Sequence, residues 1–242
     1  MRAGVLLLTI LLSAMMGGVH AADVPSGVKP TKRTQDFPWM SVAAWERMHA
    51  EDTLVARHDS VEVLFVGDSI IAGWDSSLWQ QNFAPLKAAN FAIGGDHTGN
   101  MLWRLQHGAI GNLKPKLVVV LAGVNNFGHL QETPEQVAQG VAAVVGQVQL
   151  AWPESRILLN AVLPFEESAK SPRRQQVKKL NELLADLDDN NTVFLKDYGS
   201  LFLSPDGNIS ADLMGDFLHP TTKGYEAWAN AMLPDIRTLL AL

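Results

Sequence analysis

The sequence predicts one α/β domain in which a parallel sheet lies between two layers of helices. Short β-branched runs alternate along the chain with longer amphipathic segments, which is typical of this fold class. The hydrophobic content is 47% over 242 residues, enough for one full core. We therefore expect a three-layer α/β/α sandwich with a five-stranded parallel sheet, built from residues 37–242.

Five apolar runs are the candidate strands. Each is short, rich in β-branched residues and bounded by polar or turn-forming residues. They span residues 61–66, 88–93, 117–122, 157–162 and 192–195. Because helical segments separate them, the strands are expected to run parallel.

Three segments carry helix start signals. The segment from Thr133 to Gln136 is a capping box with proline at the first helical position, and valines at helical spacing follow it. A second helix is expected from Ser171-Pro172 and a third after Pro220, each with one apolar face and one polar face.

The N-terminus has the pattern of an export signal. Met1 and Arg2 supply a positive region, residues 5–16 are almost wholly apolar, and Val19-His20-Ala21 places small residues at the cleavage positions. We expect a signal peptide over residues 1–21 and a periplasmic or secreted mature protein. An uncleaved anchor is the alternative, but the run is shorter than the roughly 20 residues that span a bilayer. Residues 22–36 are interpreted as a linker or N-terminal arm without chemistry.

Composition argues against several classes of protein. The net charge of -6 gives no basic surface for nucleic acid or anionic lipid, so we expect neither as a partner and no stable membrane anchor. The chain has no cysteine, which excludes disulfides, thiol nucleophiles and cysteine-ligated zinc. His97 stands beside Asp96 without further ligands at metal-binding spacing, so neither a metal nor a cofactor is expected. The oligomeric state stays open, and a homodimer is possible.

Four polar blocks lie where a ligand site is expected. In open α/β sheets, ligands bind beyond the carboxyl ends of the strands. The blocks are Gly67-Asp68-Ser69-Ile70, Gly94-Gly95-Asp96, Gly123-Val124-Asn125-Asn126 and Asp216-Phe217-Leu218-His219-Pro220. Taken singly, each has a structural explanation as a turn, a helix cap or a surface loop. Taken together, they could supply a nucleophile, oxyanion donors and a base.

These blocks resemble those of the SGNH or GDSL hydrolases, which are named for a serine, a glycine, an asparagine and a histidine. The matching residues are Ser69, Gly95, Asn125 and His219. The neighbouring residues resemble the catalytic subunits of the platelet-activating factor acetylhydrolase type most closely, over nearly the whole chain from about residue 60. The resemblance implies a flavodoxin-like sandwich and serine ester hydrolysis that needs no cofactor.

The resemblance also implies a role for each matching residue. Ser69 is expected to be the nucleophile, His219 its general base, and Asp216 the group that orients His219. The backbone N–H groups of Ser69 and Gly95 and the side-chain amide of Asn125 are expected to form the oxyanion hole.

Asp68 and Asn126 are interpreted as hydrogen-bonding residues behind the site. Neither stands where the family places a reacting group.

The candidate substrate-binding residues are Ile70, Val124, Leu218, Trp74 and Phe165. The first three adjoin the reacting residues and suggest a small acyl pocket, with plain core packing as the alternative. Trp74 could stack on a sugar ring or a lipid edge. Phe165 follows a Leu-Pro pair after which similar subunits carry a basic residue, which disfavours a phospholipid and favours a short-chain ester such as an O-acetyl group on a glycan.

Other functions remain as alternatives. Lysophospholipase or thioesterase activity would use the same residues. A non-catalytic glycan-binding module of the same fold would be expected to have lost Ser69 or His219, and a nucleotide binder would need a glycine-rich phosphate loop after the first strand.

Overall fold

The computed structural model describes residues 24–241. The predicted signal peptide, residues 1–21, lies outside the described residues. The strands are β1 (Val63–Val66), β2 (Ala88–Asn90), β3 (Leu117–Val120), β4 (Arg156–Asn160) and β5 (Val193–Lys196). They form one parallel sheet in the order β2-β1-β3-β4-β5. This confirms the predicted fold class, with a strand order found in flavodoxin-like folds.

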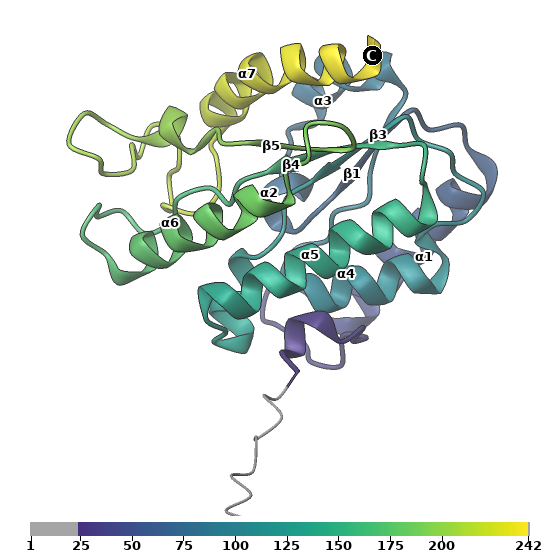
Figure 1. Cartoon of the computed structure of the whole chain (residues 1–242), viewed down its shortest axis with the longest axis horizontal. Helices are drawn as coiled ribbons and strands as arrows, with labels where there is room; N and C mark the ends of the chain where they lie inside the picture. The colour runs from purple at the N-terminus through teal and green to yellow at the C-terminus, as the bar shows by residue number, and fades with distance from the viewer. Residues whose placement is uncertain (1–23, 242) are drawn as a thin grey trace, which may run out of the picture.

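Helices cover both faces of the sheet (Figure 1). They are α1 (Val42–His58), α2 (Ser69–Ala72), α3 (Ser76–Asn82), α4 (Thr98–Arg104), α5 (Pro134–Ala151), α6 (Pro172–Leu184) and α7 (Thr222–Ala241). Short 3-10 or π-helical segments are η1 (Ser26–Val28), η2 (Ala84–Leu86), η3 (Leu105–Ala109), η4 (Asn126–Leu130), η5 (Ala185–Leu187) and η6 (Gly199–Phe202). Helices α4 and α5 lie side by side on one face, and α3 and α7 lie on the other (Figure 1). Within residues 24–241, no helix has the length and apolar character needed to cross a bilayer.

The helix start signals act as predicted. The Thr133 side chain accepts from Gln136 N–H, and the Gln136 side chain accepts from Thr133 N–H, so the capping box of α5 is complete. Ser171 caps α6, and α7 begins shortly after Pro220. Helix α1 was not predicted, because only three of its side chains are buried and its apolar stripe is correspondingly weak.

The register of the sheet brings the ends of three strands together. Val66 at the end of β1 pairs with Val120 at the end of β3, and Phe65 pairs with Asn90 at the end of β2. The predicted runs 88–93 and 157–162 extend beyond the ends of β2 and β4. Their last residues lie past the strands but are buried, so they look like strand residues in the sequence. The polar blocks that follow β1, β2 and β3 therefore meet at one edge of the sheet.

An aromatic cluster joins α7 to the segment after α2. Trp228 is fully buried and stacks on Trp74, with ring centroids 5.3 Å apart. Tyr225 packs against Trp74 and donates a hydrogen bond from its hydroxyl to the carbonyl of Ile70 at 2.8 Å. The cluster thus attaches the C-terminal helix to the turn that carries Ser69.

We expect Trp228→Ala to lower the free energy of unfolding by about 3–5 kcal/mol, because it leaves a large cavity in this cluster. Urea denaturation followed by circular dichroism measures the change. Leu150→Ala is the control, since Leu150 is 78% exposed near the end of α5 and its removal should change stability by less than about 0.5 kcal/mol. A similar loss in both variants would contradict the packing described here.

Candidate active site

Ser69 lies at a tight turn between β1 and α2. The Asp68 side chain accepts from Ile70 N–H at 2.9 Å and so caps the helix. A side chain at Gly67 would come within 2.9 Å of the Leu121 carbonyl oxygen, so this turn needs glycine. The turn leaves Ser69 partly exposed at the edge where the strands end.

Ser69, His219 and Asp216 form one hydrogen-bonded chain. Ser69 Oγ lies 2.8 Å from His219 Nε2, and His219 Nδ1 lies 2.7 Å from Asp216 Oδ2. With the His219 proton on Nδ1, Nε2 can accept from the serine hydroxyl. The structure therefore brings together the three residues that were predicted to be catalytic.

The loop that carries His219 is organised by Asp216. Oδ1 of Asp216 accepts from the N–H groups of Leu218 at 3.0 Å and His219 at 2.7 Å. Burial acts to raise the pKa of Asp216, but the hydrogen bonds from His219 and from the two backbone N–H groups outweigh it and lower the pKa. Asp216 is thus held as a carboxylate that orients the imidazole.

The predicted oxyanion donors lie beside Ser69. Gly95 has a φ of +75°, a conformation that favours glycine, and a Cβ on Gly94 would lie 3.7 Å from Cβ of Ser69. Asn125 donates from Nδ2 to the Asp96 carbonyl at 3.0 Å, which ties its amide to the same loop and leaves a second amide hydrogen available. Within the described part of the chain, the N–H groups of Ser69 and Gly95 have no acceptor.

Asp68 is completely buried behind the nucleophile. Burial raises its pKa to about 7, and no hydrogen-bond partner for its Oδ2 is found in residues 24–241. The carboxyl is therefore largely neutral below neutral pH.

Asn126 is also buried and joins three segments. Its Oδ1 accepts from Thr98 N–H at 3.1 Å, and its Nδ2 donates to Thr98 Oγ1 at 2.7 Å and Glu132 Oε2 at 2.8 Å. Glu132 in turn accepts from Gly27 N–H at 2.7 Å. These contacts support the interpretation of Asn126 as a hydrogen-bonding residue behind the site.

Arg33, in the arm from which we expected no chemistry, contacts the oxyanion loop. It is 4% exposed, and its Nη2 donates to the Gly94 carbonyl at 2.8 Å and to Asp96 Oδ1 at 3.0 Å. A single arginine in a polar, aperiodic segment carries no sequence signal of such a contact. Only the folded arm brings it to the loop.

Asp96 is the centre of this buried network. Besides Arg33, it accepts from Trp45 Nε1 at 2.7 Å and from Arg104 Nε at 2.7 Å. Arg104 also reaches Asp52, at 3.2 Å. Helices α1 and α4 and the arm are thus linked to the loop that carries Gly95.

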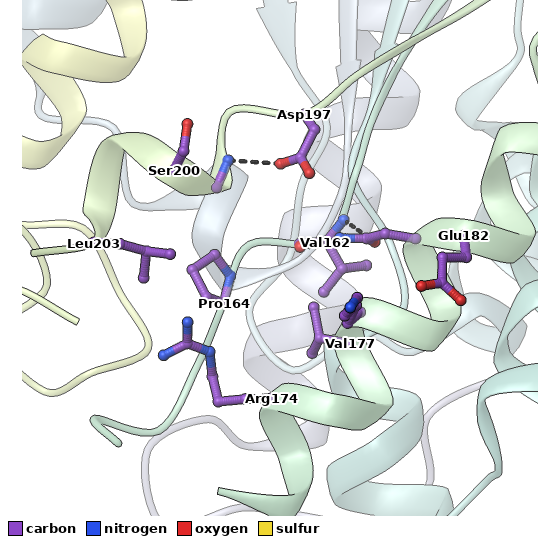
Figure 2. Close-up of a pocket in the computed structure, with 11 residues that line it drawn as sticks. Val162, Pro164, Arg174, Val177, Glu182, Asp197, Ser200 and Leu203 are labelled. Atoms are coloured by element: carbon purple, nitrogen blue, oxygen red, sulfur yellow. Dashed lines mark hydrogen bonds between the residues drawn. The ribbon is translucent and has the colours of Figure 1, made fainter. Parts of the chain in front are cut away.

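A cavity of about 440 Å³ lies elsewhere, beyond the ends of β4 and β5. Figure 2 shows Pro164, Arg174 and Leu203 on one side of it and Asp197 on another. Its lining has charges of both signs and includes no member of the Ser69, His219 and Asp216 chain. The hydrogen-bonded chain, and not this cavity, therefore marks the chemical site.

Comparisons with known proteins agree with this geometry. Residues 65–227 match the GDSL-like Lipase/Acylhydrolase family. The chain belongs to that family. As a member of this acylhydrolase family, it is an ester hydrolase.

Two curated relatives cover most of this acylhydrolase. It is 39% identical over 208 residues to platelet-activating factor acetylhydrolase IB subunit alpha2 of Gallus gallus, which covers 85% of this chain and 83% of that protein. It is 34% identical over 229 residues to the alpha1 subunit of Homo sapiens, covering 94% of each chain. The predicted resemblance to this type of subunit is confirmed.

A solved structure shows the same fold. A GDSL-like lipase from Bacteroides thetaiotaomicron superposes on the acylhydrolase with a TM-score of 0.66 and 22% identity, covering 83% of this chain and 99% of that chain.

The predicted substrate-binding residues of the acylhydrolase fall into two groups. Ile70 is 1% exposed and Trp74 is 7% exposed within the aromatic cluster. Packing covers most of both side chains, and their contact with substrate stays a prediction. Leu218 and Phe165 are half-buried and Val124 is buried, and their substrate contacts stay predictions.

No group of three or more histidine and acidic side chains in residues 24–241 of the acylhydrolase is placed to hold a metal ion. His97 instead caps α4, with its ring nitrogen accepting from Gly99 N–H at 3.1 Å.

The raised pKa of Asp68 makes the stability of the acylhydrolase depend on pH. The native state holds this proton more tightly than the unfolded chain, whose aspartates have pKa values near 3.9, so stability should fall as the pH rises from about 4 to 7. One such group changes the free energy of unfolding by at most about 1.4 kcal/mol per pH unit. We expect Asp68→Asn to remove the contribution of Asp68 to this pH dependence. The variant should therefore become more stable relative to wild type as the pH approaches 7.

Urea unfolding at several pH values within that window measures the slope. Glu154→Gln makes the same charge change at an exposed position and should keep the wild-type slope. If Asp68→Asn also kept it, Asp68 would be ionised throughout the window and the described burial effect would be absent.

Proposed function

We propose that this protein is an exported serine esterase that hydrolyses short acyl esters, acetyl esters foremost, with an O-acetylated glycan as its substrate. The observation that supports the reaction is the Ser69, His219 and Asp216 chain, with 2.8 Å between Ser69 Oγ and His219 Nε2. Export is proposed from the charged and apolar pattern of residues 1–21.

The proposed mechanism has two halves. His219 Nε2 takes the proton as Ser69 Oγ attacks the ester carbonyl carbon, and Asp216 stabilises the imidazolium that forms. The tetrahedral oxyanion accepts from Ser69 N–H, Gly95 N–H and the Asn125 amide. His219 then gives its proton to the leaving alcohol, and the acyl group stays on Ser69. Water, deprotonated by His219, attacks that acyl group and releases the acid and free Ser69.

Two observations support a short acyl group. The curated relatives are named acetylhydrolases and cover most of the chain. Around Ser69, the neighbouring Ile70 and the predicted pocket residue Val124 are both buried, so the packing next to the nucleophile leaves little room for a long chain.

Two classes of compound, a lipid and a glycan, are candidates for the alcohol half of the ester. The relatives' names favour platelet-activating factor or a similar lipid. We favour an acetylated glycan, because Phe165 occupies the position where a basic residue would suit a phosphate group. The proposed export, which would put the protein outside the cytoplasm, also favours a glycan. A non-catalytic glycan-binding module is disfavoured, since the complete hydrogen-bonded chain is retained.

We expect Ser69→Ala and His219→Ala to lower ester hydrolysis on the order of 10⁶-fold, because each removes a group that reacts. Asn125→Ala should lose roughly 10²- to 10³-fold in kcat, since one oxyanion donor is removed and others remain. Steady-state hydrolysis of nitrophenyl acetate measures all three. Labelling by a fluorophosphonate probe should disappear in Ser69→Ala, and turnover like wild type in that variant would refute the mechanism.

Chain-length dependence tests the acyl preference. Across nitrophenyl esters of rising chain length, kcat/KM should be highest for acetate and fall steadily, because longer chains meet the buried residues beside Ser69. Acetate release from acetylated sugars, measured in parallel, tests the glycan. Preference for long acyl chains would contradict the proposal and favour lysophospholipase activity.

A further inference from the structure

Residues Phe37 to Met40 form a tight turn that presents two aromatic rings. Phe37 N–H donates to the Met40 carbonyl at 2.9 Å, and Met40 N–H donates to the Phe37 carbonyl at 3.1 Å. The rings of Phe37 and Trp39 stack, with centroids 4.9 Å apart and planes 3° apart. The Arg33 guanidinium lies 5.3 Å from the Phe37 ring centroid. We call Phe37 and Trp39 the aromatic platform, and these contacts hold it in place.

The aromatic platform adjoins the predicted oxyanion loop. A Cβ on Gly95 would clash with Cη2 of Trp39. A Cβ on Gly94 would lie 3.6 Å from Cζ3 of Trp39 and 3.7 Å from Cβ of Ser69. Trp39 and Ser69 therefore flank the same glycine. Trp39 is nevertheless 57% exposed, so part of its indole is open to solvent beside this glycine.

A polar cleft of about 370 Å³ begins beside the platform, lined by Phe37 and Gly95 among others. Arg33 also lines it, and within residues 24–241 nothing accepts from its buried Nη1. His97 lines it as well, and because its Nδ1 accepts from Gly99 N–H, its ring proton is on Nε2. His97 Nε2 is thus a hydrogen-bond donor in the cleft that suits a hydroxyl or ether oxygen.

The cleft has little uncompensated positive charge. Arg33 is paired with Asp96 at 3.0 Å, and Lys32 is paired with Glu46. Burial lowers the pKa of His97 to about 4, and burial and then Arg33 lower the pKa of His129, so both rings are neutral at neutral pH. Among the described residues that line the cleft, a phosphate would therefore meet no unpaired cation, whereas a neutral ligand with hydroxyl groups suits the His97 donor.

Few large apolar side chains are well exposed within residues 24–241. They are Val24, Trp39, Leu54, Leu150 and Leu201. Of these, Trp39 is the one that lies beside Gly94 and Gly95.

We propose that Trp39, which lies beside Gly94 next to Ser69, binds the alcohol half of the ester, and that this half is a neutral sugar ring whose C–H face stacks on the indole. The inference rests on the proposed function, since it assigns the group that leaves from Ser69. The freed sugar oxygen takes its proton from His219.

The test compares two acetyl esters, an O-acetylated methyl pyranoside and ethyl acetate, which share the acyl group but differ in having a ring. Trp39→Ala should lower kcat/KM on the pyranoside about tenfold, mainly through KM, and change it less than about twofold on ethyl acetate. Trp39→Phe should keep most of the pyranoside activity, because a ring remains. Leu54→Ala removes a side chain that is also 57% exposed, and it should change neither substrate.

A second measurement uses binding without turnover. Ser69→Ala protein should bind the acetylated pyranoside in calorimetry, and adding Trp39→Ala should weaken this binding about tenfold.

Three results would overturn the inference: an equal loss on both esters in Trp39→Ala, no loss on the pyranoside, or a wild-type preference for an acetylated glycerophosphocholine over the pyranoside. If the hydrolysis of ethyl acetate still depended on Ser69 in these cases, the proposed function would stand and only this inference would fail. Hydrolysis of ethyl acetate by Ser69→Ala at the wild-type rate would instead overturn the proposed function itself.

Discussion

The arrangement of the site depends on the hydrogen bonds that the buried carboxylate of Asp96 accepts. It accepts from Arg33 of the arm, Trp45 of α1 and Arg104 of α4, and it follows directly on Gly95. A buried carboxylate is costly unless it is paired and fully hydrogen-bonded, so these donors are needed wherever Asp96 is buried. The same contacts hold the oxyanion loop in position, since Arg33 also donates to the Gly94 carbonyl.

Two other aspartates show how environment separates the roles of one residue type. Asp216 lies in an exposed loop and accepts from backbone N–H groups and from His219, which keeps it ionised. Asp68 is completely buried, which raises its pKa to about 7, and one of its oxygens has no hydrogen-bond partner within residues 24–241. Asp216 can therefore stabilise an imidazolium, while Asp68 mainly caps the helix that carries Ser69.

The candidate site could be predicted well where chemistry is encoded locally. Ser69, Gly95 and Asn125 lie in the segments that follow β1, β2 and β3, and the register of these strands brings the segments to one edge. Residue type and spacing did not show how deeply the candidate substrate-binding residues are buried. Ile70 and Trp74 adjoin the nucleophile in sequence, but α7 packs over this region, as the contact of Tyr225 with Ile70 and Trp74 shows.

By itself, the sequence determined the α/β class, the strands, the capped helices and the order of the polar blocks, because periodicity and capping act within a few residues of each other. Only the tertiary structure decided which surface faces the nucleophile. Arg33 and Trp39 come from the beginning of the chain, and their contacts with Gly94 and Gly95 span more than fifty residues of sequence. Such contacts depend on how the N-terminal segment packs against the folded domain, and no local pattern of residues predicts that packing.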